Sequence, residues 1–499
     1  MVDKKRLSIF SYPYNLVTVI TIIASVFSLL HIGQKSLWLD EGYSILFGKV
    51  SWGDFWLITY YLELNQVLYH LLLRFWLVFG DSEFAVRSLS ALFSVASVPV
   101  LYALASRLFG VRAGLISILL LSGNAFFVAY AQEARGYALV LFLVVLSSYL
   151  FVRVIEDPSD RRIFCGYICI STLAVYAHFF GALVLMAQAL SVPFIPAGKL
   201  QLRKLVLANL LIAALLSPIV LFVLFKDVGQ LSWVPKPTFS SLKSLAQDLA
   251  GNAGSWGNQV IMPLTAFYVF ACLIALMDAL LTVLKTGRSI DTWRYALIIS
   301  WVAVPICLTF SLSFWKPLLA SRFLIVSLPG LVLLAGVGIS IIRDNRCRIL
   351  LLAFLVVLSF RTTLTEYYPK EKKQNFRDAV SYVVSHSERG DGISFYPAFM
   401  IVPFEYYWDH LNTRQVFLDA IYPWKFDQTI SPPPARPLRF LSALAWRQDR
   451  YERFWVVESH DFGGSEATLR SILSVVENNF HLQVTKRYNG VRVLLFVRK

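Results

Sequence analysis

Charged residues are scarce in this chain: they make up 15% of its 499 residues, whereas hydrophobic residues make up 57%. Soluble globular domains carry about 25% charged residues. The composition therefore excludes an ordinary soluble protein, and the abundance of apolar residues excludes intrinsic disorder. Cysteine is scarce as well, and five cysteines exclude a disulfide-rich scaffold. The sequence predicts a protein that lies largely in a lipid bilayer.

The net charge of +15 does not indicate nucleic-acid binding. Residues 1–361 carry 28 Lys and Arg against 16 Asp and Glu, whereas residues 362–499 carry 18 against 15. The excess thus falls in the apolar part, where basic residues mark the cytoplasmic ends of membrane spans. We expect no nucleic-acid partner, and we expect a multi-pass protein of the plasma (inner) membrane.

Apolar runs long enough to cross a bilayer recur along residues 13–361. A helix of about 20 residues crosses a hydrocarbon core of about 30 Å. About eleven transmembrane helices are predicted, at 13–34, 84–106, 113–130, 132–152, 163–180, 181–197, 205–225, 259–284, 293–314, 322–342 and 348–361. The basic clusters between them fall on one face, which the positive-inside rule makes cytoplasmic, together with the N-terminus.

The long connections all fall on the opposite, extracytoplasmic face: residues 35–83, residues 226–258 and the part from residue 362. Within the first loop, residues 65–79 are apolar but short, so we expect them to lie in the interface or to re-enter the membrane. The sequence thus predicts a transmembrane domain over residues 1–361, with both long loops, and an extracytoplasmic domain over residues 362–499.

The C-terminal part changes to alternating short elements, which predict a small α/β domain. The expected helices are 375–387, 400–411 and 465–478, the expected strands are 392–396, 453–458, 482–487 and 491–497, and a Pro-rich loop is expected at 431–437. Aromatic residues gather at 396–408. We interpret them either as an ordinary core or as part of a cap that covers the membrane site and helps to select an acceptor.

Two adjacent carboxylates, Asp40 and Glu41, directly follow the first span in a Leu-Trp-Leu-Asp-Glu-Gly-Tyr stretch, residues 37–43. Ionisable groups close to a membrane are costly and often functional. A carboxylate at this position can take a proton from a hydroxyl or bind a cation. The alternative is a solvated pair on the loop.

A second polar cluster lies where the third and fourth predicted spans meet, in the Gln-Glu-Ala-Arg-Gly-Tyr stretch of residues 132–137. Glu133 and Arg135 are two positions apart and face different ways, which suits separate roles better than one mutual ion pair. The donor fork of Arg135 suits a phosphate. The alternative is an interfacial charge pair that fixes the connection.

Single polar residues near the outer ends of other spans complete the candidates. His178 ends the fifth span and is either a ligand of substrate or metal or an interface residue. Lys316 and Arg322 flank the outer end of the tenth predicted span. They are either cations of the functional site or ordinary anchors whose charged ends reach the interface by snorkelling. We assign Arg87 a structural role, as a partner of a loop carboxylate.

The order of these motifs resembles the bacterial PMT-type membrane glycosyltransferases of the GT-C fold, which include the protein O-mannosyltransferases and the lipid A aminoarabinose transferases. The resemblance covers nearly the whole chain. It departs from the family at two places: Asn65-Gln66-Val67-Leu68-Tyr69 stands where His- or Asn-Pro-Pro-Leu-Tyr is usual, and Phe323 stands where Tyr is common.

The resemblance implies a polyprenyl-phosphate-linked sugar as the donor, a hydroxyl acceptor on a glycan, a lipid or a protein, and inversion at the anomeric carbon. Asp40 would be the general base, with Glu41 and Glu133 positioning hydroxyls. The phosphate would be bound by Arg135 with Arg322 or Lys316. Substrate contacts are expected from Tyr43, Asn65, Tyr69, Tyr137 and His178.

The sequence requires no cofactor, but a divalent cation, Mg²⁺ or Mn²⁺, held by Glu41, Glu133 or His178 stays open. Within the enzyme class, transfer to protein Ser or Thr is the alternative acceptor reaction. A multi-span transporter or flippase is a further alternative, although such proteins place ionisable groups near the bilayer midplane. The last alternative is a non-catalytic assembly or receptor protein.

Overall fold

The structure is a computed structural model that describes residues 4–196, 198–225, 234–253, 259–369, 373–412, 418–420, 450–459 and 466–499. The chain forms two compact units, and the first contains residues 1–32, 64–72 and 85–370. The second unit contains residues 33–63, 73–84 and 371–499. Most of the first long loop therefore falls in one compact unit with the C-terminal part, and the predicted division into a domain over residues 1–361 and one over residues 362–499 stays a prediction.

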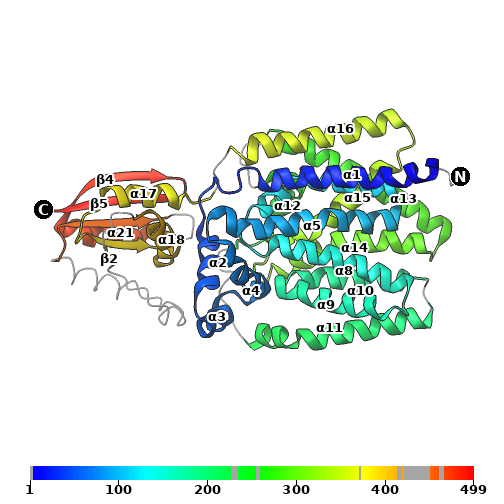
Figure 1. Cartoon of the computed structure of the whole chain (residues 1–499), viewed down its shortest axis with the longest axis horizontal. Helices are drawn as coiled ribbons and strands as arrows, with labels where there is room; N and C mark the ends of the chain where they lie inside the picture. Colours follow the sequence, from blue (N-terminus) through cyan, green and yellow to red (C-terminus); the bar gives the residue numbers. More distant parts are fainter. Residues whose placement is uncertain are drawn as a thin grey trace. The chain divides into compact units, whose positions relative to one another are not determined.

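The first unit is a bundle of apolar helices (Figure 1). Its helices are α1 (Lys4–Leu29), α5 (Glu83–Phe109), α6 (Val111–Gly123), α7 (Ala125–Ala131), α8 (Tyr137–Glu156), α9 (Arg161–Ala177), α10 (Gly181–Ser191), α11 (Lys199–Phe225), α12 (Phe239–Gln247), α13 (Ile261–Thr286), α14 (Ile290–Leu312), α15 (Leu328–Ser340) and α16 (Asn345–Thr362). The first two residues of α5, Glu83 and Phe84, belong to the second unit, and α4 (Val67–Trp76) is divided between the units after Leu72.

Each of the eleven predicted spans corresponds to a helix or to a broken helix. In the described ranges, seven helices are long and apolar enough to cross a membrane, and the pair α6 and α7, bent by 64°, counts as an eighth. The apolar part of α1 and the helices α9 and α10 are shorter. The structure thus confirms the polytopic helical class, and the exact number of spans stays a prediction.

The centre of the bundle is formed by α8 and α15. Within the most apolar stretch of each helix, 83% of the residues of the α15 segment and 72% of those of α8 are buried, against 28% in α11, α13 and α16. Glycine permits this close packing: a Cβ at Gly338 would lie 1.9 Å from the Ala271 carbonyl oxygen of α13. The outer helices keep apolar faces exposed, as expected of helices that face lipid.

The second unit contains a five-stranded sheet with the order β2-β1-β3-β5-β4. Its strands are β1 (Gly392–Tyr396), β2 (Asp419–Ala420), β3 (Arg453–Glu458), β4 (Phe480–Tyr488) and β5 (Val491–Arg498). Strands β2, β1 and β3 are parallel, whereas β5 is antiparallel to β3 and β4. This confirms the predicted α/β domain, and each of its predicted strands and helices corresponds to an observed element. The predicted Pro-rich loop lies outside the described residues.

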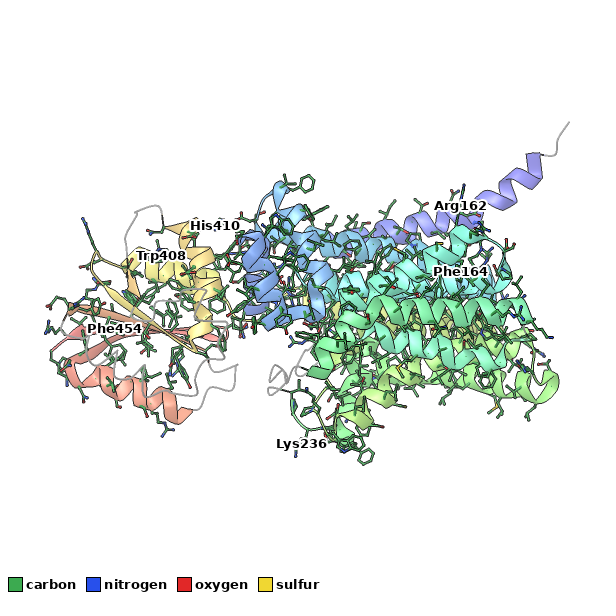
Figure 2. All side chains as sticks on the ribbon, turned by 90° about the horizontal axis from the view of Figure 1, so that it is seen from below. Arg162, Phe164, Lys236, Trp408, His410 and Phe454 are labelled. Atoms are coloured by element: carbon green, nitrogen blue, oxygen red, sulfur yellow. The ribbon has the colours of Figure 1, made fainter. Side chains whose placement is uncertain are left out.

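Helices cover both faces of this sheet. Phe454, labelled in Figure 2, and Val456 pack in one core with Ile472 and Val476 of α21 (Glu466–Asn479). The opposite face meets α17 (Phe376–His386) and α18 (Ile401–Leu411), with the rings of Phe395 and Phe404 4.9 Å apart. β3 is buried on both faces, as strands between two helical layers are.

The same unit contains the short helices of the first long loop. These are α2 (Leu39–Lys49), α3 (Trp52–Ile58) and the π-helical turn η1 (Thr59–Glu63). The chain then passes through the 3₁₀ turn η2 (Leu64–Gln66), which belongs to the first unit, into α4, and a last 3₁₀ turn, η3 (Leu77–Phe79), returns to the second unit. Residues 65–79 thus form α4 with its flanking turns, and their expected place in the interface or in a re-entrant loop stays a prediction.

Candidate active site

The two adjacent carboxylates of the first motif occupy the first turn of α2. Acidic side chains are favourable there because the helix N-terminus carries a partial positive charge. The Glu41 side chain folds back over this end, and its Oε2 accepts the backbone N–H of Trp38 at 3.4 Å. Glu41 is 1% exposed, whereas Asp40 is half-buried. The structure thus gives the two carboxylates different environments: Glu41 is buried and caps its own helix, whereas Asp40 is partly accessible to solvent.

Tyr43 lies one turn further along α2, beside Asp40 and Glu63. Burial raises the pKa of its hydroxyl well above the usual value, and the negative charges of Glu63 and Asp40 raise it further. Tyr43 therefore stays protonated and can donate a hydrogen bond. Glu63, which ends the π-helical turn, was not among the sequence candidates.

The second motif forms the turn between α7 and α8 in the first unit. Glu133 and Arg135 are each 4% exposed, and the Arg135 amide donates to the Glu133 carbonyl oxygen at 2.8 Å. The next amide, of Gly136, donates to Oε1 of Gln66 at 2.8 Å. A Cβ at Gly136 would lie 2.8 Å from the Ala177 carbonyl oxygen. The turn is thus enclosed by the Asn65–Tyr69 segment and by the end of α9.

Gln132, the first residue of this motif, has a structural role. Its Nε2 donates to the carbonyl oxygens of Phe27, Ser28 and Leu30 at 2.7–3.2 Å, where α1 ends. Its Oε1 accepts the Tyr367 hydroxyl at 3.1 Å. These bonds satisfy carbonyl groups that a helix end leaves without partners. The motif is therefore tied to the end of α1, within the same unit.

Aromatic rings join two predicted residues of the first unit, Tyr137 and His178, with Tyr130 and Phe323 into one group, the Tyr130 cluster. The Tyr137 ring meets the Tyr130 ring edge-on at 5.0 Å between centroids and lies tilted 5.7 Å from the His178 ring. The His178 ring lies 5.3 Å from that of Phe323, next to Arg322. Glu133, Arg322 and Asp248 lie within electrostatic reach of the Tyr130 hydroxyl. Arg322, Glu133 and Asp248 therefore lie near the end of α7, and Arg135 lies in the turn that joins α7 to α8. The two cations, Arg135 and Arg322, suit an anionic ligand.

Asp248 enters this cluster through the second long loop. It begins the π-helical turn Asp248–Asn252, which Asn124 fastens to α7 by donating from Nδ2 to the Leu249 carbonyl oxygen at 2.9 Å. Gly251 has φ +120° there, a conformation that favours glycine. The Asn-Ala sequence before α7 and the Asp-Leu-Ala-Gly sequence of the loop gave no signal of this pairing.

The remaining sequence candidates occupy different surroundings. Tyr69 is fully buried and shares a 2.9 Å hydrogen bond with Ser90, whereas its neighbour Asn65 is half-buried. Lys316 is exposed on the turn after α14, and in the described part of the chain no side-chain contact joins it to the Tyr130 cluster. Arg87 is buried and donates to the Ile32 backbone carbonyl oxygen at 2.8 Å, and its pairing with a loop carboxylate stays a prediction.

The metal candidates do not form a ligand set. Among the described residues, no three His, Cys, Asp or Glu side chains lie close enough to hold a metal ion together. Glu41 is occupied with its helix end, and the His178 ring packs between Tyr137 and Phe323. Among the described residues, the candidates therefore form no three-residue metal site.

Comparison with known proteins places this architecture. Residues 67–222 match the family model of dolichyl-phosphate-mannose-protein mannosyltransferases. ArnT of Cupriavidus metallidurans, in a crystal structure bound to undecaprenyl phosphate, is 12% identical with a TM-score of 0.59, over 96% of this chain and 97% of that one. No curated protein sequence matches the chain.

A second group of similar structures comes from an archaeon. The Archaeoglobus fulgidus oligosaccharyltransferase tethered to an acceptor peptide is 11% identical with a TM-score of 0.53, over 98% of this chain and 74% of that one. The same enzyme, AglB, in complex with an inhibitory peptide and a dolichol-phosphate, has a TM-score of 0.52 at 12% identity.

The fold is that of the GT-C membrane glycosyltransferases. Within this class, the family-model match over residues 67–222 confirms the resemblance to the PMT-type, ArnT-like enzymes that the motifs indicated.

Proposed function

We propose that the protein transfers a hexosyl or pentosyl group from a polyprenyl-phosphate donor to a hydroxyl acceptor on the extracytoplasmic face of the membrane. The observation that carries this proposal is that the two compact units, each taken by itself, supply the charges that the reaction needs. In the second unit a half-buried carboxylate, Asp40, stands at a helix N-terminus, and in the first unit Arg135 is buried and Arg322 is half-buried. The lipid phosphates bound by ArnT and AglB in their structures support a donor of the same chemistry.

Asp40 acts as the general base in this proposal. It accepts the proton of the acceptor hydroxyl while that oxygen attacks the anomeric carbon of the sugar. The protonated Tyr43 beside it donates a hydrogen bond to a substrate oxygen. Glu41 is assigned a positioning role instead of a direct one, since its carboxylate caps α2.

Arg135 and Arg322 bind the leaving group, which is the polyprenyl phosphate. As the new bond to the acceptor oxygen forms, the bond from the anomeric carbon to the phosphate oxygen breaks, and the phosphate keeps the electron pair. Negative charge therefore grows on the phosphate, where the Arg135 and Arg322 guanidinium groups offset it at low dielectric. Attack opposite to the leaving phosphate inverts the anomeric configuration.

Three acceptor classes suit this chemistry: a glycan, a lipid headgroup, or the Ser and Thr hydroxyls of a protein. The protein acceptor is favoured by one specific observation, the description of the matched family as protein mannosyltransferases. The reconstitution experiment distinguishes the three acceptor classes.

Reconstitution tests the proposed function. The purified protein in lipid nanodiscs is supplied with polyprenyl-phosphate sugars and with short glycans, lipid A precursors or Ser- and Thr-containing peptides. We expect free polyprenyl phosphate and one glycosylated acceptor class with inverted configuration. If the protein instead moves the intact donor lipid across a proteoliposome membrane without consuming it, the protein is a flippase and the proposal fails.

A further inference from the structure

We propose that Arg377, Tyr407 and Glu83 are positioning residues that hold the segment leading to Asp40, so that the C-terminal domain takes part in catalysis by fixing the general base. This inference rests on the proposed function of Asp40. All the contacts that carry it lie within the second compact unit.

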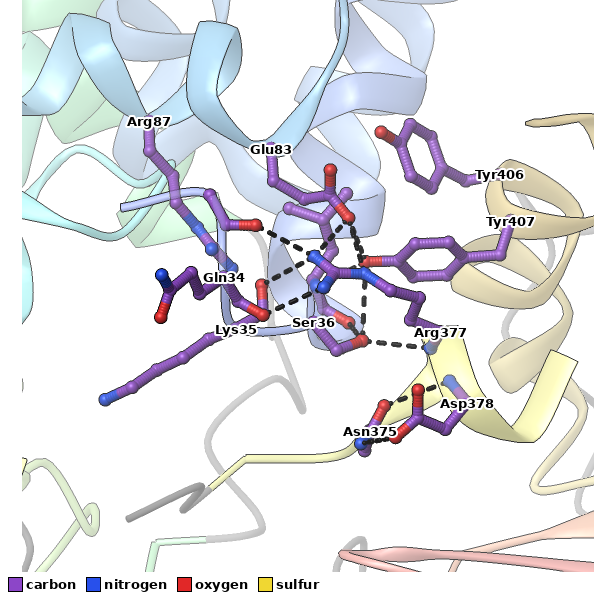
Figure 3. A network of polar contacts seen from close by, with 12 residues as sticks. Gln34, Lys35, Ser36, Glu83, Arg87, Asn375, Arg377, Asp378, Tyr406 and Tyr407 are labelled. Carbon is purple, nitrogen blue, oxygen red and sulfur yellow. Dashed lines mark hydrogen bonds and ion pairs between the residues drawn. The ribbon is translucent and has the colours of Figure 1, made fainter. Parts of the chain in front are cut away.

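Arg377, the second residue of α17, reaches the segment before α2 with its whole donor fork (Figure 3). Its Nη1 and Nη2 donate to the backbone carbonyl oxygens of Gly33, Gln34 and Lys35 at 2.8–3.3 Å. Its Nε and Nη2 donate to Oε1 of Glu83 at 3.1 and 2.6 Å. One side chain thus joins three successive carbonyls at the start of the first loop to a carboxylate at its end.

Tyr407 of α18 continues this clamp. Its hydroxyl accepts the Leu37 backbone N–H at 2.7 Å and donates to Oε1 of Glu83 at 2.9 Å. Burial raises the pKa of the Tyr407 hydroxyl, and the Glu83 charge raises it further, so the hydroxyl stays protonated and can fill both roles. Ser36 lies in sequence between Lys35, which Arg377 binds, and Leu37, which Tyr407 binds. Its Oγ accepts the Arg377 backbone N–H at 3.1 Å.

The clamp therefore holds every residue from Gly33 to Leu37 and ends three positions before Asp40. An irregular segment without these partners would leave backbone carbonyls to water and would move freely. Asp40 would then move with it, since α2 starts at Leu39.

A second contact fixes α2 from its other side. Gly42 packs on the backbone of Pro403 in α18, and a Cβ at Gly42 would lie 3.2 Å from the Pro403 Cα. α18 thus contacts the first turn of α2 through Pro403 and the preceding segment through Tyr407. These contacts assign the domain a positioning role, which differs from the acceptor-selecting cap that the aromatic cluster suggested.

The test compares three variants in the full-length protein: Arg377→Ala, Arg377→Lys and Tyr407→Phe. Lysine keeps a charge for Glu83 but lacks the planar fork that meets the carbonyls of residues 33–35. Arg453→Ala is the matched control, because Arg453 also bonds a carboxylate and a backbone carbonyl, those of Glu388 and His386, but within the C-terminal domain alone. Three quantities are measured: the hydrogen exchange of the residue 33–42 amides, and the kcat and the KM of sugar transfer.

We expect Arg377→Ala to speed exchange at residues 33–37 and to lower kcat by about a hundredfold, the effect of a misplacement of about 1 Å, with the donor KM little changed. Arg377→Lys should recover part of kcat, Tyr407→Phe should speed exchange chiefly at Leu37, and Arg453→Ala should leave kcat and the exchange of residues 33–42 as in the parent protein.

Three results would overturn the inference in distinguishable ways. Unchanged exchange in Arg377→Ala would show that the clamp does not hold the segment. Faster exchange with unchanged kcat would refute the positioning role and leave the proposed function intact. Absence of transfer in the parent protein, with the exchange pattern as expected, would refute the proposed function and with it the catalytic meaning of the clamp.

Discussion

Replacing Gln66 by methionine should loosen the turn that carries Glu133 and Arg135. Gln66 is fully buried, and its Oε1 accepts the Gly136 amide at 2.8 Å. Methionine fills nearly the same volume, so packing changes cost less than about 1.5 kcal/mol. The Gly136 amide, however, loses its acceptor, and a buried unsatisfied N–H costs about 1–3 kcal/mol. We expect the variant to be destabilised by about 2–4 kcal/mol and to transfer sugar more slowly.

The matched control is Gln188→Met in α10. Gln188 is also buried, and its carboxamide bonds Tyr167, Ser147 and Ser148 at 2.9–3.2 Å, away from the turn. The assay is denaturant-induced loss of near-ultraviolet circular dichroism in detergent, followed by transfer kinetics of the folded fraction. Both variants should lose stability, but only Gln66→Met should lose transfer. If Gln66→Met keeps the stability and the turnover of the parent, the Gln66–Gly136 bond does not hold the turn.

Two further predictions concern charge. Arg135→Ala should raise the KM for the polyprenyl-phosphate sugar about tenfold to a hundredfold, since a hydrogen bond to a charged group contributes about 1.5–3 kcal/mol, and leave the acceptor KM nearly unchanged; equal changes in both would make Arg135 structural. Burial raises the pKa of Asp391 to about 6, so its contribution to stability is complete below the usual pKa near 4 and is lost as the pH rises through about 6. Asp391→Asn should remove this loss, measured as amide protection of β1 and β3 at pH 4.5 and pH 7, and a protection ratio unchanged by the substitution would contradict it.

Much of the architecture could be predicted from the sequence because its signals are local. Apolar runs of membrane length need no partner to be recognised, and the strands at 392–396 and 453–458 are short β-branched and aromatic runs between turn residues. The short helices α2 and α3 were missed inside a loop, since helices of this length are marginal alone and depend on packing. The two-residue strand β2 carries too few residues for any pattern.

The candidate site, too, was only partly predictable from the sequence. The motifs identified Asp40, Glu41, Glu133 and Arg135. The sequence cannot distinguish the two adjacent carboxylates, however, and their roles differ only because the Glu41 side chain turns back to the Trp38 amide. Gln66, read as a departure from the family pattern, meets Gly136 across 70 positions. Contacts over such separations have no local signature. The same holds for Arg377, whose partners begin more than 290 residues earlier.

The assignment of Asp40 as the general base is the central claim, and single-turnover transfer by Asp40→Asn tests it most directly. The purified variant in nanodiscs is loaded with a polyprenyl-phosphate sugar and mixed with the acceptor, beside the parent protein and Glu41→Gln. We predict that Asp40→Asn binds the donor as the parent does, keeps its stability, and transfers at least about a hundredfold more slowly. Glu41→Gln should be less stable than the parent protein, but its folded fraction should keep much of the parental turnover. Near-parental transfer by Asp40→Asn would contradict the account and move the base to another carboxylate.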